Sequence, residues 1–128
     1  MRSAFDVAVG VISMGADVLL SRRQQHQDHG GLWEFPGGKL DHGESPQQAL
    51  ARECQEELGI VIDSFQPLLQ VWHDYRSYSV LLHVFMVSRF CGQPQGREGQ
   101  QVRWVSRSCL SEYHFPAANE AIVASLCF

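Results

Sequence analysis

Three glutamates near the middle of the chain, Glu53, Glu56 and Glu57, are spaced so that they could share one face of a helix. At 100° per residue, positions i, i+3 and i+4 are neighbours on a helix surface. Like charges at this spacing repel, and the helix dipole disfavours the last two near the C-terminus. A compensating cation is therefore expected, either a divalent ion such as Mg²⁺ with oxygen ligands or the fixed charge of Arg52. Glu44 lies just before this helix and could turn toward the cluster.

The helix that must position these carboxylates is expected over residues 45–58. Ser45 is a good N-cap, Pro46 suits the first helical position, and Gln48 completes a capping-box pattern. Gly59 fits the position just past the C-terminus. A separate apolar stripe consists of Leu50, Ala51, Cys54 and Leu58. Taken alone, the glutamates are better explained as the solvated face of an ordinary amphipathic helix. The residues around them must therefore distinguish a metal site from a solvated acidic face.

Strands are expected on both sides of this helix. They cover Phe5–Ile12, Val18–Ser21, Leu32–Phe35, Phe65–Trp72, Tyr78–Ser88 and Gln101–Val105. Pro36-Gly37-Gly38 is a strong turn signal, and residues 116–126 carry a final helical pattern. This order predicts an α/β fold in which a mixed β-sheet is sandwiched between α-helices.

Length and composition limit the function classes. The chain has 128 residues, which predicts one domain over residues 1–128. The formal net charge of −4 leaves no basic excess for duplex nucleic acid, so a small nucleotide is the better candidate partner. The longest apolar runs, of about ten residues, are too short to span a membrane. Four scattered cysteines without a CxxC pair suggest reduced thiols in a cytoplasmic protein.

The segment from Gly38 to Ile60 resembles the Nudix box, the signature of the Nudix hydrolases. The pattern is G-x5-E-x7-R-E-U-x-E-E-x-G-U, where U is a bulky apolar residue. This chain has Gly38, then Glu44, then Arg52-Glu53-Cys54-Gln55-Glu56-Glu57-Leu58-Gly59-Ile60, so every fixed position matches. Cys54 stands where an aliphatic residue is usual, which affects only packing because a buried cysteine acts as a small hydrophobe.

The resemblance implies hydrolysis of a nucleoside diphosphate linked to another moiety, with Mg²⁺ or Mn²⁺ as the metal. The metal-ligating positions would be Glu53, Glu56, Glu57 and the carbonyl of Gly37. Glu44 or Glu53 would be the general base, and both assignments stay open. Arg52 would orient the helix.

Similarity beyond the box points to the MutT-type subgroup, whose members convert 8-oxo-dGTP, and dGTP more weakly, to the monophosphate and pyrophosphate and so cleanse the nucleotide pool. The stretches that carry this similarity are Val7–Ile12, Trp33–Lys39, Gly96–Gln100 and Phe115–Glu120. The last two lie outside the general signature and therefore indicate the subgroup.

The resemblance implies functional roles for several residues in or near these stretches. For each residue a simpler structural explanation is also open. Glu98 would be a further metal ligand or base, or else a solvated loop acid. Arg23 would contact substrate, or else be a surface arginine. Phe35 would line a base pocket, or else be a core aromatic. The subgroup often has Pro-Asp-Arg within the region of residues 72–78; here Arg76 stands about two places earlier and Tyr78 takes the position of the base-contacting arginine.

Asn119 is the candidate specificity residue. Its amide offers an acceptor and two donors, which match the O6 acceptor and N7–H donor of 8-oxoguanine. Ordinary guanine presents an acceptor at N7, and a buried mismatch of this kind costs about 1–3 kcal/mol. The alternative is that Asn119 only caps the last helix.

Three functional hypotheses follow. The first is a monomeric, Mg²⁺-dependent nucleoside triphosphate pyrophosphohydrolase of MutT type. The second is a Nudix hydrolase of modified pyrimidine nucleotides, such as oxidised or methylated dCTP, which the altered region at Arg76 allows and Asn119 disfavours. The third is a non-catalytic nucleotide-sensing module, which the retention of all four glutamates of the box argues against.

Overall fold

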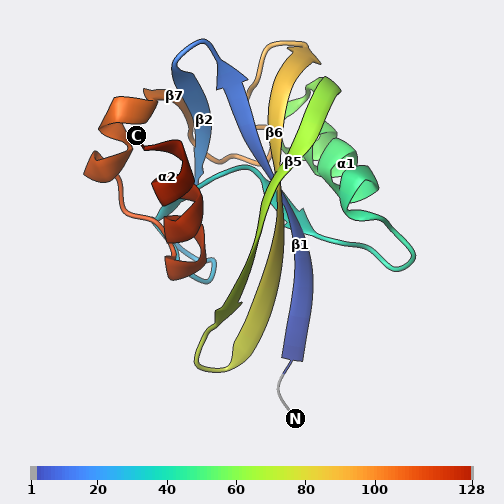
Figure 1. The fold of residues 1–128 in the computed structure, drawn as a ribbon, viewed down its shortest axis with the longest axis vertical. Helices are drawn as coiled ribbons and strands as arrows, with labels where there is room; N and C mark the ends of the chain where they lie inside the picture. Colours follow the sequence, from blue (N-terminus) through green and yellow to red (C-terminus); the bar gives the residue numbers. More distant parts are fainter. Residues whose placement is uncertain (1–2, 128) are drawn as a thin grey trace.

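A mixed sheet of seven strands forms the centre of the computed structural model, which describes residues 3–127 (Figure 1). The strands are β1 (Ser3–Met14), β2 (Asp17–Arg22), β3 (Trp33–Glu34), β4 (Gly37–Lys39), β5 (Val61–Asp74), β6 (Tyr78–Cys91) and β7 (Val102–Ser106). Their order is β3-β2-β1-β6-β5, with β4 paired to β1 and β7 to β2. Among the strand pairs formed by residues 3–127, only β1 and β6 run parallel, so the predicted mixed sheet is confirmed.

Helices cover opposite sides of this sheet, as predicted (Figure 1). The α-helices are α1 (Pro46–Leu58) and α2 (Glu120–Leu126), and 3₁₀ turns cover Arg107–Glu112 and Ala117–Asn119. Within residues 3–127, none of the helices has the length and apolar character needed to cross a membrane.

The local signals at both ends of α1 act as predicted. Ser45 Oγ accepts the Gln48 backbone N–H at 3.1 Å, and the Gln48 side chain accepts the Ser45 N–H at 2.9 Å. Gly59 ends the helix with φ of +73°, a conformation that favours glycine. These two caps fix the limits of α1 and therefore the direction in which its glutamates point.

The alternating side chains of β1 contribute to two apolar layers. Val9 and Val11 pack in the layer that includes Ile122 of α2. Ala8 and Ile12 pack on the other face with Ala49, Leu50, Cys54 and Leu58 of α1. Ala51, expected in this apolar stripe, is exposed, and Ala49 is buried in its place. The sheet is therefore held between two cores, one for each helix.

Three predictions about the elements need correction. Gly37–Lys39 is a short strand paired with Val7–Val9 rather than part of a turn. Strand β5 begins at Val61, directly after the helix cap, instead of at Phe65. The last helix is α2, which starts only at Glu120 after a 3₁₀ turn, and Asn119 makes no side-chain capping bond. The capping role considered for Asn119 is thus wrong, because this residue is itself in the helical conformation.

Replacing Leu50 with alanine should lower the free energy of unfolding by about 2–5 kcal/mol, since the side chain is fully buried beneath α1. Urea denaturation followed by circular dichroism would measure the loss. Leu68→Ala, at a side chain 36% exposed, is the matched control and should change stability far less. Equal losses for the two variants would contradict the packing described for α1.

Candidate active site

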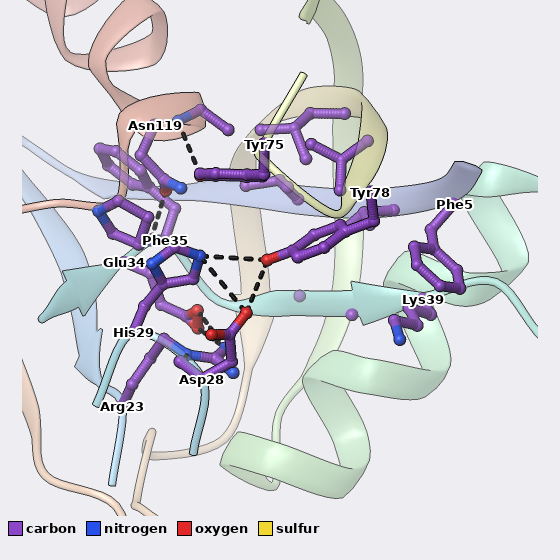
Figure 2. Close-up of a pocket in the computed structure, with 18 residues that line it drawn as sticks. Phe5, Arg23, Asp28, His29, Glu34, Phe35, Lys39, Tyr75, Tyr78 and Asn119 are labelled. Carbon is purple, nitrogen blue, oxygen red and sulfur yellow. Dashed lines mark hydrogen bonds and ion pairs between the residues drawn. The ribbon is translucent and has the colours of Figure 1, made fainter. Parts of the chain in front are cut away.

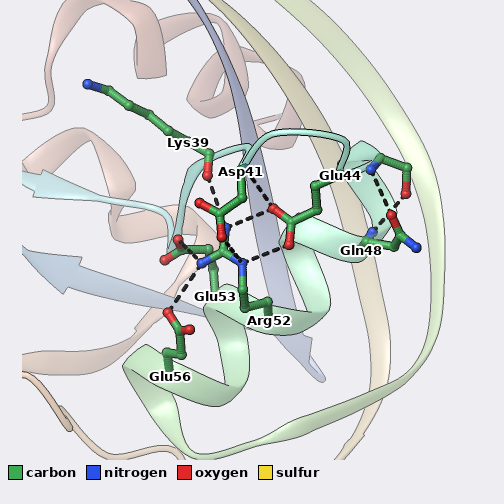
Figure 3. Close-up of polar contacts among 8 residues, drawn as sticks. Lys39, Asp41, Glu44, Gln48, Arg52, Glu53 and Glu56 are labelled. Atoms are coloured by element: carbon green, nitrogen blue, oxygen red, sulfur yellow. Dashed lines mark hydrogen bonds and ion pairs between the residues drawn. The ribbon is translucent and has the colours of Figure 1, made fainter.

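Arg52 gathers the acidic residues at one edge of α1 (Figure 3). Its Nε and Nη2 donate to the two carboxylate oxygens of Glu44 at 2.8 and 2.9 Å. Its Nη1 donates to Glu53 at 2.8 Å and to Glu56 at 3.2 Å. Nη2 also donates to the carbonyl of Lys39, which ties α1 to β4. The fixed cation considered from the sequence is therefore present, and it orients both the helix and its carboxylates.

Glu44 is the most completely paired of these acids. Besides its two bonds from Arg52, it accepts the backbone N–H of Asp41 at 2.8 Å. These hydrogen bonds, the Arg52 bond foremost, lower the pKa of Glu44 to about 2. Glu44 is thus held as an anion that binds Arg52.

Glu57 lies one helical turn after Glu53 and lines a small cleft that we call the acidic cleft. The cleft is lined by Arg23, Glu34, Gly37, Glu57, Glu98 and Gln100 among others. Glu57 Oε2 accepts the backbone N–H of Gly37 at 3.1 Å. Burial, together with the carboxylates of Glu53, Glu34 and Glu98, raises the pKa of Glu57 to about 9. The cleft therefore brings together three carboxyl groups, of Glu34, Glu57 and Glu98, with the guanidinium groups of Arg22 and Arg23.

The donor set of this cleft fits a hard divalent cation. Within residues 3–127, neither Glu57 nor Glu98 forms an ion pair, whereas Glu34 is paired with Arg23. Carboxylate and carbonyl oxygens are the ligands that Mg²⁺ and Mn²⁺ prefer. In the described part of the chain no three acidic, histidine or cysteine side chains form a ready-made ligand group. Glu53 and Glu56 are both turned onto Arg52.

A second hollow, of about 350 Å³, opens beside the acidic cleft, and we call it the aromatic cavity (Figure 2). Its walls include Phe5, His29, Phe35, Tyr75, Tyr78 and Asn119. The strands β1 and β6 form one side, and the loop of residues 23–32 between β2 and β3 forms the other. An aromatic-lined hollow with a few polar groups is typical of a site for a planar organic ligand.

Asn119 is the polar group deepest in this wall. It is 9% exposed, and its Oδ1 accepts the backbone N–H of Phe35 at 3.4 Å. Because a backbone N–H can only donate, this contact identifies the side-chain oxygen and leaves a second lone pair and the NH₂ group. The ring of Phe35 is almost fully buried and stacks on Phe115, 5.7 Å between centroids. Phe35 therefore packs in the core, the plainer alternative considered for it, and also lines the aromatic cavity.

Arg23 joins the two hollows. Its Nη1 donates to both oxygens of Glu34 at 2.9 and 3.1 Å, and its Nε donates to the carbonyl of Asp28. Arg23, Glu34 and Gly37 line both the aromatic cavity and the acidic cleft. Burial raises the pKa of Glu34 despite the nearby guanidinium. Any ligand long enough to occupy both hollows would pass Arg23.

Several residues of these walls were missed from the sequence. Glu34 stands within the quoted Trp33–Lys39 stretch and could have been noticed, because it alternates with the buried Trp33 on β3. Tyr75 lies in the 72–78 region where the chain departs from the subgroup. Asp28 and His29 occupy a polar loop in which no pattern distinguishes them.

Comparisons with known proteins identify the family and the fold. A NUDIX domain family model matches residues 7–125. The chain is 36% identical to the 8-oxo-dGTP diphosphatase of Escherichia coli (strain K12), over 94% of each protein. It is 33% identical to the CTP pyrophosphohydrolase of the same strain, over 89% of this chain and 84% of that protein. A solved structure from work on MutT of Aliivibrio salmonicida and Vibrio cholerae has a TM-score of 0.84, with 37% identity and 97% of both chains covered.

These relatives are matched over 84% or more of their own length. The family identified from the spacing of the glutamates is thereby confirmed. The chain belongs to the NUDIX family.

Proposed function

We propose that this protein is a Mg²⁺-dependent pyrophosphohydrolase that converts 8-oxo-dGTP to its monophosphate and pyrophosphate. The observation that carries the proposal is the junction between the two hollows, which share Arg23, Glu34 and Gly37. A nucleotide can place its base in the aromatic cavity and direct its phosphates toward the carboxylates. The relative named 8-oxo-dGTP diphosphatase supports this choice of substrate.

Selection of the oxidised base is assigned to Asn119. Its Oδ1 already accepts one N–H, from Phe35, and its second lone pair is available to the N7–H of 8-oxoguanine. The NH₂ group of the same amide is a donor for O6. Unmodified guanine would set its N7 lone pair against the amide oxygen. The two bases are therefore distinguished by the hydrogen atom that 8-oxoguanine carries on N7 and guanine lacks.

Glu53, Glu56, Glu57 and Glu98 would hold the metal together with the carbonyl of Gly37. Bound Mg²⁺ would withdraw charge from the phosphoryl oxygens and lower the pKa of a bound water. We assign the general base to Glu53 because burial raises its pKa, whereas Glu44 is held as a low-pKa anion by Arg52. Since every residue used here comes from one chain, we propose that the monomer is active.

The first test is a substrate panel with Mg²⁺, comparing kcat/KM for 8-oxo-dGTP, dGTP, CTP and 5-methyl-dCTP. The highest value is expected for 8-oxo-dGTP, with monophosphate and pyrophosphate as products. Excess EDTA should abolish turnover, and added Mg²⁺ should restore it. Preference for a cytosine nucleotide would overturn the base assignment and favour the pyrimidine alternative, for which the CTP-hydrolysing relative is a precedent.

Removing the amide of Asn119 should lower the preference for 8-oxo-dGTP over dGTP roughly tenfold to hundredfold, the equivalent of one buried hydrogen-bond mismatch. The ratio of the two kcat/KM values for Asn119→Ala measures this. Asn119→Asp is the matched variant of nearly equal size, which keeps an acceptor but loses the donor for O6. If both variants keep the native ratio, Asn119 does not read the base.

Glu53→Gln should reduce kcat by about 10²- to 10⁴-fold, as expected for loss of a general base and metal ligand. Glu44→Gln should cost less, because a glutamine oxygen still accepts from Arg52. Glu112→Gln, at an exposed acid on the 3₁₀ turn, should leave the rate unchanged. A larger loss of kcat in Glu44→Gln than in Glu53→Gln would instead assign the general base to Glu44.

A further inference from the structure

A hydrogen-bonded group of three side chains lies at the rim of the aromatic cavity and takes no part in the chemistry proposed above (Figure 2). The hydroxyl of Tyr78 donates to Asp28 Oδ2 at 2.6 Å. His29 Nε2 lies 3.1 Å from that hydroxyl and 3.5 Å from the same carboxylate. Asp28 and His29 belong to the loop of residues 23–32, and Tyr78 begins β6. The contacts therefore connect this loop to the sheet across the cavity mouth.

Ring contacts extend the connection along the cavity wall. The ring of Tyr75 lies 5.1 Å from Tyr78 and 4.8 Å from His29, measured between centroids. The hydroxyl of Tyr75 accepts the backbone N–H of Ala118 at 3.0 Å. Ala118 directly precedes Asn119, so one continuous set of contacts runs from the loop to the proposed base-reading residue.

The backbone of His29 has a less common conformation within this loop. Among residues 3–127, His29 is the only non-glycine residue with positive φ, at +59°. That conformation is unfavourable for a residue with a Cβ atom, so interactions elsewhere must maintain it. The side-chain contacts of His29 with Tyr78 and Tyr75 are suited to this task.

The same loop also fixes Arg23 at the junction of the two hollows. Arg23 Nε donates to the Asp28 carbonyl, while its Nη1 holds Glu34. A displacement of Asp28 would therefore move a hydrogen-bond partner of Arg23 as well as one wall of the aromatic cavity.

We propose that Asp28, His29 and Tyr78 form a latch that positions the 23–32 loop and so prearranges the aromatic cavity for the nucleobase. This inference rests on the proposed function, because it assigns the base to that cavity. The three are positioning residues: they hold the walls and Arg23 in place before the nucleotide arrives. The base then binds without first having to order the loop.

Tyr78→Phe tests the latch, since it removes the hydroxyl and keeps the ring that packs on Tyr75. KM for 8-oxo-dGTP should rise roughly tenfold, the value of one hydrogen bond to a charged group, while kcat changes much less. KM for dGTP should rise by the same factor, because the latch positions walls that both bases contact. The discrimination assigned to Asn119 should therefore survive in this variant.

A second readout does not depend on activity. The amides of Gln27, Gly31 and Leu32 are hydrogen-bonded within the loop, and their hydrogen exchange should be roughly tenfold faster in Tyr78→Phe. Tyr113→Phe is the matched control, because it also removes a hydroxyl bonded to a charged group, Arg103, but outside the cavity. It should change neither KM nor loop exchange.

Variants of Asp28 separate the hydrogen bond from simple charge. Asp28→Asn keeps an acceptor for the Tyr78 hydroxyl and should retain most of the loop protection, whereas Asp28→Ala should lose it. The double variant Asp28→Ala with Tyr78→Phe should be no more perturbed than Asp28→Ala alone, because both changes break the same bond. Additive effects, or native KM and exchange in Tyr78→Phe, would overturn the latch.

Failure of the latch can be distinguished from failure of the proposed function. If the native protein does not prefer 8-oxo-dGTP but Tyr78→Phe still loosens the loop, the assigned substrate is wrong and the loop contacts stand without a nucleotide-positioning role. If the native preference holds and Tyr78→Phe changes nothing, only the latch is wrong.

Discussion

The burial of several carboxylates beside one helix is the constraint on which the rest of the structure depends. A carboxylate removed from water is costly unless it is paired, hydrogen-bonded or protonated. Here the acids form two sets according to their partners. Arg52 donates hydrogen bonds to Glu44, Glu53 and Glu56, whereas within residues 3–127 Glu57 accepts only a backbone N–H, and its pKa is raised.

This division explains how structural and chemical roles can share one short helix. The Arg52 set ties α1 to the preceding loop through Glu44 and to β4 through the Lys39 carbonyl, so it fixes the direction of the helix. The acidic cleft holds the carboxyl groups of Glu57 and Glu98, which form no ion pair within residues 3–127 and are the kind of oxygen ligand that a divalent cation prefers. Glu53 contacts Arg52 and also affects the pKa of Glu57, and is thus placed between the two sets.

Much of this arrangement could be predicted because it depends on local rules. The limits of α1 follow from the Ser45 cap and Gly59, and the spacing of the glutamates identified the family. What could not be predicted depends on contacts between distant segments. Arg23 and Glu34 meet because β2 pairs with β3, and Tyr78 reaches Asp28, which lies 50 residues away in the sequence. For Asn119 the sequence also allowed a helix cap, and only the structure shows that its side chain makes no capping bond and instead accepts the N–H of Phe35.

The glycines before the box show how a local signal can be correct and still mislead. Pro36-Gly37-Gly38 is typical of a turn, yet Gly37 and Gly38 pair with β1. A Cβ atom at Gly37 would lie 2.0 Å from the Ala8 carbonyl oxygen, and one at Gly38 would lie 2.6 Å from the Glu53 carboxyl carbon. Glycine is therefore needed at position 37 for close approach to the β1 backbone, whereas at position 38 the near atoms are the end of the flexible Glu53 side chain. That approach lets Gly37 line both hollows and donate its N–H to Glu57, so a three-residue strand joins the proposed base site to the proposed metal site.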